Sequence, residues 1–361
     1  MAISEAEVRH ALGVLVDPNT GKDYVSTRSV KAIRVSGGDI EVELELGYPG
    51  KSQFEPLRRE VAAALKKLGA ASVQVKVNAK VVSHSVQRGV KLVPGIKNII
   101  AVASGKGGVG KSTTAVNLAL ALAAEGASVG VLDADIYGPS QPTMLGIAGR
   151  PESKDGKSLE PMEGHGLQAI SIGFLIDVDT PMVWRGPMVT QALEQLLKDT
   201  RWRDLDYLVV DLPPGTGDIQ LTLAQKVPVT GAVIVTTPQD IALIDARKGL
   251  KMFEKVGIPI LGIVENMSYH VCPKCGHESH IFGAGGAERM CKDYGTELLG
   301  QLPLDEGIRE QADSGKPTVV SDPEGKSAEI YRRIARRCAV RIAELQKDMT
   351  SKFPNIVVQN T

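Results

Sequence analysis

Apolar residues recur along much of the chain in short continuous runs, and helix-like segments lie between several of these runs from about residue 98 onward. Continuous apolar runs are typical of strands that are buried on both faces of a parallel sheet. The alternation predicts a doubly wound, mainly parallel α/β sheet that binds its ligand at the carboxyl ends of the strands. The runs cover residues 99–103, 129–133, 207–211, 231–237 and 260–265.

The first 88 residues show a different pattern, in which apolar and polar positions alternate over short stretches. Residues 30–35 and 40–46 alternate on either side of a Gly-Gly pair, and residues 71–77 alternate again, as strands with one buried face do. Residues 4–15 and 56–68 have helical spacing. The pattern therefore predicts a small α+β domain.

Proline and glycine mark the junction between the two regions. Lys91-Leu92-Val93-Pro94-Gly95 directly precedes the first continuous apolar run, which favours a linker at this place. The expected division is an α+β domain over residues 1–88, a linker over 89–97, an α/β domain over 98–346 and a polar tail over 347–361.

Composition and charge limit the classes of partner. With 361 residues, of which 43% are hydrophobic, the chain is long enough for two domains with a sizeable core. The 42 basic and 42 acidic residues cancel, which points away from nucleic acid and anionic membranes as partners. No apolar run approaches the roughly 20 residues of a membrane span, and the stretch from Met1 to Arg9 lacks the layout of a secretory signal. We therefore expect a cytoplasmic protein.

Residues 105–112 read Gly-Lys-Gly-Gly-Val-Gly-Lys-Ser and form a phosphate-binding loop between an apolar run and a helical segment. The glycines let backbone N–H groups surround a β-phosphate, and the following helix directs its N-terminus at the phosphate. Lys111 is expected to contact the β- and γ-phosphates of ATP, and Ser112 to bind Mg²⁺. The expected nucleotide-binding residues here are Gly105, Lys106, Gly107, Gly108, Val109, Gly110, Lys111, Ser112 and Thr113.

Acidic residues follow two of the predicted strands. Asp211 ends the run at 207–211 and begins Asp-Leu-Pro-Pro-Gly-Thr-Gly-Asp, where it can hold a magnesium-bound water and start a loop that senses the γ-phosphate. Asp135 lies just beyond the run at 129–133, where a carboxylate can orient the water that attacks the γ-phosphorus, and Asp133 is its rival for this role. The predicted catalytic set is Lys106, Lys111, Asp135 and Asp211.

Two of the four cysteines, Cys272 and Cys275, form the single Cys-x-x-Cys of the chain. Two thiolates at this spacing can reach one metal, but a four-ligand cluster or zinc site needs two more ligands. These come either from the same pair in a second subunit or from other residues. Zinc remains an alternative, because His277 and His280 follow closely, and a redox dithiol is a further alternative for the pair.

Lys106, the second residue of the loop, resembles the extra lysine of the "deviant" phosphate loops of the MinD, nitrogenase iron-protein and arsenite-pump ATPase group. In that group the lysine reaches the nucleotide of the facing subunit. The resemblance implies a homodimer that closes on its nucleotide. It agrees with the cysteine pair, which also calls for a facing subunit.

Seven segments together resemble the Mrp/ApbC family, over about residues 95–345. They are the loop at 105–112, Asp-Ala-Asp-Ile-Tyr-Gly-Pro-Ser at 133–140, Trp-Arg-Gly-Pro at 184–187, the stretch at 211–218, Thr-Thr-Pro-Gln at 236–239, Glu-Asn-Met-Ser at 265–268, and the cysteine pair. Residues 1–88 resemble the MIP18-like module often fused in front of bacterial members. That match rests on Asp-Pro-Asn-Thr-Gly at 17–21 and on the order of segments.

The family resemblance implies an ATP-dependent iron–sulfur cluster carrier of the SIMIBI class of P-loop NTPases. It implies a labile [4Fe–4S] cluster that Cys272 and Cys275 of two subunits share, with ATP and Mg²⁺, slow hydrolysis, apo iron–sulfur proteins as recipients and upstream scaffolds as donors. It also implies adenine contacts from Asn266 and from the loop at Pro303. The alternative is a zinc-bridged or MinD-like regulatory ATPase dimer.

Overall fold

The computed structural model of the protein describes residues 3–87, 90–175 and 186–345. The tail expected over 347–361 lies outside these ranges, as do residues 88–89 near the expected linker and Trp184 and Arg185 of the motif at 184–187. Among the described residues, no helix is long and apolar enough to span a membrane.

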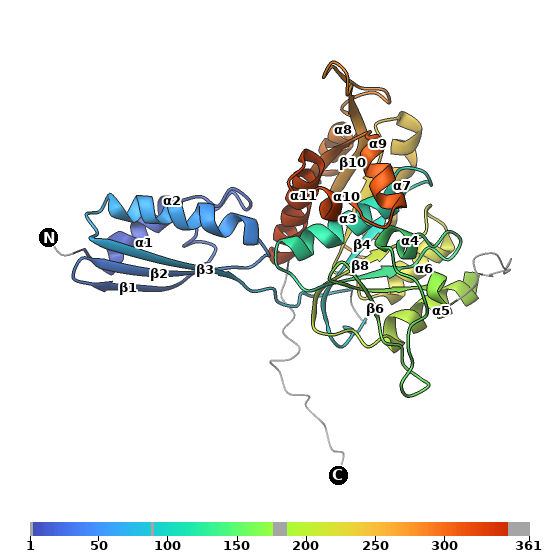
Figure 1. The fold of residues 1–361 in the computed structure, drawn as a ribbon, viewed down its shortest axis with the longest axis horizontal. Helices are drawn as coiled ribbons and strands as arrows, with labels where there is room; N and C mark the ends of the chain where they lie inside the picture. The colour runs from blue at the N-terminus through green and yellow to red at the C-terminus, as the bar shows by residue number, and fades with distance from the viewer. Residues whose placement is uncertain (1–2, 88–89, 176–185, 346–361) are drawn as a thin grey trace, which may run out of the picture.

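The amino-terminal region folds as the predicted α+β unit and forms a separate lobe in Figure 1. Ser4 caps the first helix in a reciprocal capping box with Glu7, which explains why the helix begins there. The β2 strand pairs antiparallel with β1 and parallel with β3, so β2 is central. The elements are α1 (Glu5–Val14), β1 (Val30–Ser36), β2 (Asp39–Leu46), α2 (Phe54–Lys66) and β3 (Ser72–Ala79).

The second region is built on a mostly parallel sheet, as predicted, with the strand order β11-β10-β9-β4-β8-β5-β7-β6 and β12 paired to β10. Only β6 and β11 run antiparallel to their neighbours in this sheet. The strands are β4 (Ile96–Ala103), β5 (Val129–Asp133), β6 (Met162–Gly164), β7 (Leu167–Ser171), β8 (Leu205–Asp211), β9 (Gly231–Thr236), β10 (Ile260–Val271), β11 (Glu278–Ser279) and β12 (Leu298–Pro303).

The structure extends the predicted strand pattern in two ways, by four additional strands and by a longer β10. The strands β6, β7, β11 and β12 were not among the predicted runs, because they are short or carry mixed polar residues. The β10 strand runs past the predicted end at Glu265 to Val271, since Tyr269 pairs with Pro303 of β12 after a local irregularity.

Helices cover both faces of the sheet and enclose two apolar cores. The helices α3 and α11 share one core with the amino-terminal lobe, whereas α5, α7 and α8 pack into the other. The helices are α3 (Lys111–Ala124), α4 (Gln141–Leu145), α5 (Gly186–Asp199), α6 (Asp218–Lys226), α7 (Asp240–Lys255), α8 (Gly286–Tyr294), α9 (Glu306–Asp313), α10 (Thr318–Ser321) and α11 (Lys326–Ala343).

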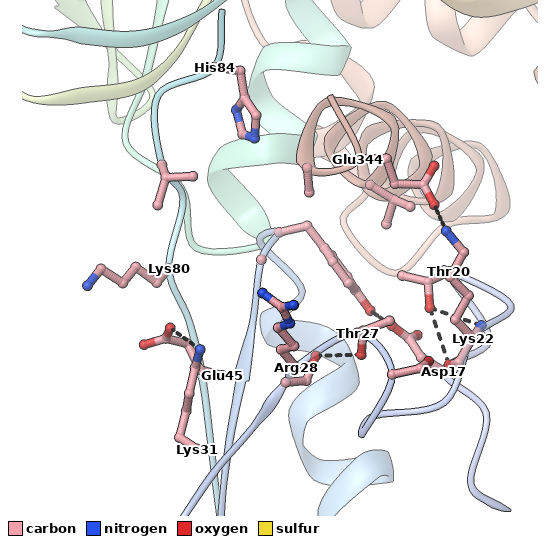
Figure 2. Close-up of a pocket in the computed structure, with 17 residues that line it drawn as sticks. Asp17, Thr20, Lys22, Thr27, Arg28, Lys31, Glu45, Lys80, His84 and Glu344 are labelled. Atoms are coloured by element: carbon pink, nitrogen blue, oxygen red, sulfur yellow. Dashed lines mark hydrogen bonds and ion pairs between the residues drawn. The ribbon is translucent and has the colours of Figure 1, made fainter. Parts of the chain in front are cut away.

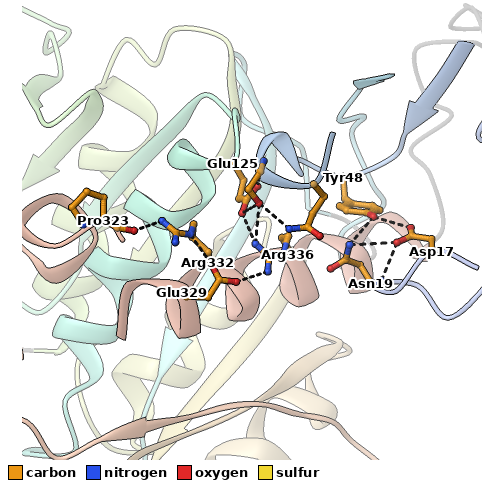
Figure 3. Close-up of polar contacts among 10 residues, drawn as sticks. Asp17, Asn19, Tyr48, Glu125, Pro323, Glu329, Arg332 and Arg336 are labelled. Atoms are coloured by element: carbon orange, nitrogen blue, oxygen red, sulfur yellow. Dashed lines mark hydrogen bonds and ion pairs between the residues drawn. The ribbon is translucent and has the colours of Figure 1, made fainter. Parts of the chain in front are cut away.

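A buried ion pair between α3 and α11 receives the contacts that join the two regions where α3 ends (Figure 3). Glu125, at the carboxyl end of α3, binds the Arg336 guanidinium of α11 at 2.5 Å, and both side chains are almost fully buried. The Ser52 hydroxyl of the amino-terminal region donates to the same carboxylate at 2.7 Å, and the Lys51 N–H donates to the Glu125 carbonyl. The amino-terminal lobe is thus attached to the helix that begins at the phosphate loop.

A cavity of about 390 Å³ lies beside this contact, between the loop that follows α1 and the end of α11 (Figure 2). An ion pair of 2.6 Å between Lys22 and Glu344 connects its two walls. Tyr48 lines the cavity and donates to Asp17 at 2.7 Å, which anchors the Asp-Pro-Asn-Thr-Gly loop singled out in the sequence.

Candidate nucleotide and metal site

The phosphate loop connects β4 to α3 in the centre of the sheet. Gly108 and Gly110 have φ angles of 79° and 80°, which favour glycine because a β-carbon is strained in this conformation. Gly105 allows a close approach, since a β-carbon there would lie 2.1 Å from the carbonyl carbon of Asp245 in α7. The loop therefore needs its glycines for shape and for packing, and it leaves the N-terminus of α3 open to an anion.

Lys111 and Asp211 meet at the base of this loop. The Lys111 ammonium lies 2.5 Å from Asp211 Oδ1 and 3.1 Å from the Ser112 hydroxyl, and Lys111 is 6% exposed. The buried ammonium, next to a hydroxyl and a carboxylate, fits the terminal phosphates of ATP. The hydroxyl and the carboxylate also fit Mg²⁺, because Mg²⁺ in such sites takes few protein ligands and completes its coordination shell with phosphates and water. The residues present therefore fit both groups.

Asp133 and Asp135 lie beside this pair and differ in their surroundings. Asp133 is fully buried and accepts hydrogen bonds from the Asp135 N–H, the Gln141 N–H and the Ser171 hydroxyl. Burial raises the pKa of Asp133 well above that of an ordinary carboxyl, and repulsion from Asp211 raises it further.

Asp135 keeps an opening to solvent. Its side chain is 12% exposed, and one carboxylate oxygen lies 3.8 Å from the Lys111 ammonium. Burial raises the pKa of Asp135, Lys111 opposes this effect, and Asp211 adds to it. A carboxylate with a raised pKa near the loop is a candidate for the residue that orients water. The backbone N–H groups of Gly138 and Tyr137 also donate to Asp135, and the choice between Asp135 and Asp133 for this role stays a prediction.

The stretch after Asp211 lies against the phosphate loop. The Gly215 N–H donates to the Ser104 carbonyl at 2.9 Å, and the Leu212 N–H donates to Val102. The Gln220 amide donates to the Pro214 carbonyl at 2.6 Å and supports the turn. These hydrogen bonds hold the stretch against Ser104, the residue that directly precedes the phosphate loop.

Asn266 and Pro303 lie on adjacent parallel strands at the same end of the sheet. The Asn266 amide donates to the Val109 carbonyl of the phosphate loop at 2.9 Å. Pro303 is buried at the end of β12, and the Leu304 N–H that follows it donates to the Tyr269 carbonyl at 2.7 Å. Asn266 thus touches the loop itself, and the adenine role expected for both residues stays a prediction.

Two buried polar residues at the site were missed by sequence reasoning. Gln141 is 1% exposed, and its amide donates to Asp211 Oδ2 at 2.9 Å. Glu265 is fully buried and accepts from the Ala287 N–H, the Ser268 hydroxyl and the Gln301 amide. An acid at the end of an apolar run was a usable signal for Glu265, whereas nothing in the local sequence marks Gln141.

The cysteine pair sits on a hairpin that projects from the end of β10 (Figure 1). The Cys272 N–H donates to the His277 carbonyl and the Gly276 N–H to the Cys272 carbonyl, each at 2.9 Å. Cys272 is partly exposed and Cys275 is exposed. Hydrogen bonds from the N–H groups of Lys274 and Cys275 and from the Cys275 side chain lower the pKa of Cys272, which favours the thiolate that binds metals.

No group of three or more His, Cys, Asp or Glu side chains within residues 3–87, 90–175 and 186–345 is arranged to hold a metal. One ring nitrogen of His280 contacts the Ser268 carbonyl at 3.0 Å, and the other lies 3.8 Å from Glu278. The histidines after the cysteines are therefore engaged elsewhere or exposed. The hairpin offers two thiols and needs other ligands to complete a four-ligand site.

The other site residues are placed as follows. Lys106 is exposed at the turn of the loop and forms no ion pair with any residue that the structure describes. Cys291 and Cys338 are buried in α8 and α11, as predicted, and burial raises the pKa of Cys291 to about 11 and that of Cys338 to about 12. These two thiols are packing residues.

Family models match both regions of the chain. The model described as "NUBPL iron-transfer P-loop NTPase" matches residues 95–339, and that described as "Iron-sulfur cluster assembly protein" matches residues 5–77. The chain is 57% identical over 339 residues to the iron-sulfur cluster carrier protein of Escherichia coli (strain K12), covering 93% of this chain and 92% of that protein. It is 52% identical over 254 residues to the iron-sulfur cluster transfer protein NUBPL of Mus musculus, covering 70% and 80%.

Solved structures agree with the fold. A nucleotide-binding protein from Archaeoglobus fulgidus, solved in complex with ADP, is 39% identical with a TM-score of 0.57 and covers 64% of this chain and 90% of that one. The cell division ATPase MinD of Pyrococcus furiosus is 24% identical with a TM-score of 0.50, over 66% of this chain and 97% of that one. The latter likeness shows the fold alone.

Proposed function

The chain belongs to the Mrp/ApbC/NUBPL family of iron–sulfur cluster carrier P-loop NTPases, and from this premise we propose that it binds a labile [4Fe–4S] cluster between two copies of itself, hydrolyses ATP and transfers the cluster to apoproteins. Upstream scaffolds would supply the cluster, and cluster binding and transfer would take place in the cytoplasm, where exposed thiols stay reduced.

The observation that carries the proposal is the half-site on the hairpin. Cys272 and Cys275 lie together at the surface with a thiolate-favouring environment, and the described part of the chain offers no set of ligands that would complete a site around them. A [4Fe–4S] cluster takes four thiolates. Two copies related by a twofold axis supply four, with no further residue needed. Exposure at the tip of a hairpin also suits a cluster that must leave for another protein.

One strand connects this hairpin to the nucleotide site. The β10 strand places Asn266 against the Val109 carbonyl of the phosphate loop, and it ends at the hairpin five residues further on. Met267 has a φ of 54°, an uncommon conformation for a residue with a side chain. A shift of the loop on nucleotide binding would move Asn266 and be transmitted along β10 to the thiols. The coupling is reciprocal, so cluster binding would alter nucleotide affinity.

Hydrolysis would use the residues that surround the Lys111 ammonium. Lys111 leaves Asp211 and binds the β- and γ-phosphate oxygens. Asp135 orients a water whose oxygen forms a bond to the γ-phosphorus, while the bond from that phosphorus to the β,γ-bridging oxygen breaks. ADP and inorganic phosphate are the products, and the proton of the water passes to solvent or phosphate.

Magnesium, when bound with the nucleotide, would neutralise phosphate charge. Ser112 would contribute its hydroxyl and Asp211 its carboxylate through water. The ammonium of Lys106, exposed and without an ion pair among the described residues, would reach the nucleotide of the facing subunit. ATP would in this way favour the closed dimer, and hydrolysis would relax the stretch from Asp211 to Asp218.

Anaerobic reconstitution with iron and sulfide tests the proposal. The wild type is expected to give a brown protein with the broad visible absorbance of a [4Fe–4S] cluster, whereas the double variant Cys272→Ala/Cys275→Ala stays colourless. Cys291→Ala is the matched control, since its thiol is buried away from the hairpin, and it should retain the cluster. Zinc alone at stoichiometric amounts in the wild type, or equal cluster content in the double variant, would refute the carrier mechanism proposed here.

A further inference from the structure

Gln141 opens the short helix α4 and lies between two parts of the nucleotide site. Its side-chain amide donates to Asp211 Oδ2 at 2.9 Å and to the Ser112 carbonyl at 3.2 Å. Its backbone N–H donates to Asp133 Oδ2 at 3.1 Å, which fixes the position of the residue. One residue thus connects the strand ends of β5 and β8 to the first turn of α3.

The two oxygens of Asp211 have different partners. Oδ1 lies 2.5 Å from the Lys111 ammonium, and Oδ2 accepts from Gln141. When Lys111 moves to the phosphates, Asp211 loses the contact to Oδ1, and this oxygen becomes free for a magnesium-bound water. The contact to Oδ2 does not depend on Lys111, so it can keep the carboxylate in the same orientation.

The other end of the Gln141 amide has no partner. Its Oε1 is buried and makes no hydrogen bond to any residue that the structure describes, whereas the residue as a whole is 1% exposed. An unpaired buried acceptor costs free energy, and native structures rarely keep one without a reason. An acceptor at this place suits a donor that arrives with the ligand, and a metal-bound water is such a donor.

We propose that Gln141 is a positioning residue for magnesium. Its amide N–H holds Asp211 when Lys111 leaves, and its Oε1 accepts from a water that the metal carries. The inference rests on the proposed ATP site and adds to it a residue that sets the metal affinity without touching the nucleotide phosphates.

Nucleotide binding with and without metal tests the role. The affinity of a non-hydrolysable ATP analogue is measured by titration calorimetry, once with Mg²⁺ and once in EDTA. Gln141→Met keeps the length of the side chain and removes both polar groups. It is expected to weaken the Mg²⁺-dependent gain in affinity about tenfold, because a hydrogen bond to a charged group is lost, and to leave the affinity in EDTA within about twofold.

Two further variants make the result decisive. Gln141→Asn keeps the amide but is one methylene too short to reach Asp211, so it should reproduce the loss and decides the matter if Gln141→Met fails to fold. Gln195→Met, on the exposed face of α5, is the matched control and should behave as wild type.

Each outcome of the titrations has a separate meaning. Equal weakening with and without Mg²⁺ would show a packing role and overturn the inference, as would unchanged affinities in both Gln141 variants while the wild type responds to Mg²⁺. If the wild type itself shows no Mg²⁺-dependent binding, the proposed ATPase function fails along with the inference.

Discussion

Two glycines of the phosphate loop have the same backbone conformation but different neighbours, which allows the contact to Asn266 to be measured. Gly108 and Gly110 have φ angles of 79° and 80°. A β-carbon at Gly108 would meet no atom within 4 Å, whereas one at Gly110 would lie 2.1 Å from Asn266 Nδ2. Substitution by alanine therefore adds the same strain at both positions and a collision at only one.

The expected costs follow from these distances. Gly108→Ala should lower the free energy of unfolding by about 1 kcal/mol, the cost of a left-handed residue with a β-carbon. Gly110→Ala should lower it by about 2–4 kcal/mol, because it also displaces the Asn266 amide and leaves the buried Val109 carbonyl without its donor. In the Asn266→Ala background this extra cost should disappear.

Urea unfolding in the absence of nucleotide provides the assay. The fluorescence of Trp202, which is 6% exposed, reports on the nucleotide-binding region, and the second tryptophan, Trp184, lies in the same region of the sequence. Equal destabilisation by the two alanine substitutions, or an extra cost of Gly110→Ala that persists without the Asn266 side chain, would refute the contact between β10 and the loop on which the proposed coupling depends.

Three further predictions concern other parts of the molecule. Glu125→Gln should destabilise the protein by about 3 kcal/mol in thermal or urea unfolding, because it leaves the buried Arg336 guanidinium with the half-exposed Glu329 as its remaining carboxylate partner. Glu55→Gln, in an exposed ion pair, is the control and should cost less than about 1 kcal/mol. Iodoacetamide at pH 8 should label Cys272 and Cys275 of the cluster-free protein and should label Cys291 only after the protein unfolds, since burial raises the pKa of Cys291 to about 11 and keeps its thiol protonated. Rapid labelling of Cys291 in the native protein, detected by peptide mass spectrometry, would contradict its burial. Asp135→Asn should slow single-turnover ATP hydrolysis about 100-fold and leave ATP affinity nearly unchanged, and an unaffected rate would exclude Asp135 from orienting the water.

The sequence predicted the elements whose local pattern decides their structure. Apolar runs followed by glycine or aspartate predicted the phosphate loop between β4 and α3 and the acids at the ends of β5 and β8. The amino-terminal region could be predicted equally well, because the alternation of apolar and polar residues and helix caps such as Ser4 act within a few residues. In these segments tertiary contacts add to what the local sequence already favours.

The rest depends on contacts between segments distant in the chain. Gln141 follows Gly-Pro-Ser and is typical of a turn, and only the folded chain, in which α4 packs against α3 and α9, brings its amide to Asp211, 70 residues away. The extension of β10 to Val271 depends on pairing with β12, and the polar sequence of this part of β10 does not predict that pairing. The buried contact of Glu125 with Arg336 spans 211 residues and carries no motif.

Native mass spectrometry of the anaerobically reconstituted protein tests most directly whether each chain holds half of the cluster site. The account predicts a homodimer that carries about four iron and four sulfide ions per two chains, that separates when a chelator removes the iron, and that does not form when the Cys272→Ala/Cys275→Ala variant is treated in the same way. A monomer that retains a complete cluster, or a dimer whose cluster survives the loss of both hairpin thiols, would contradict it.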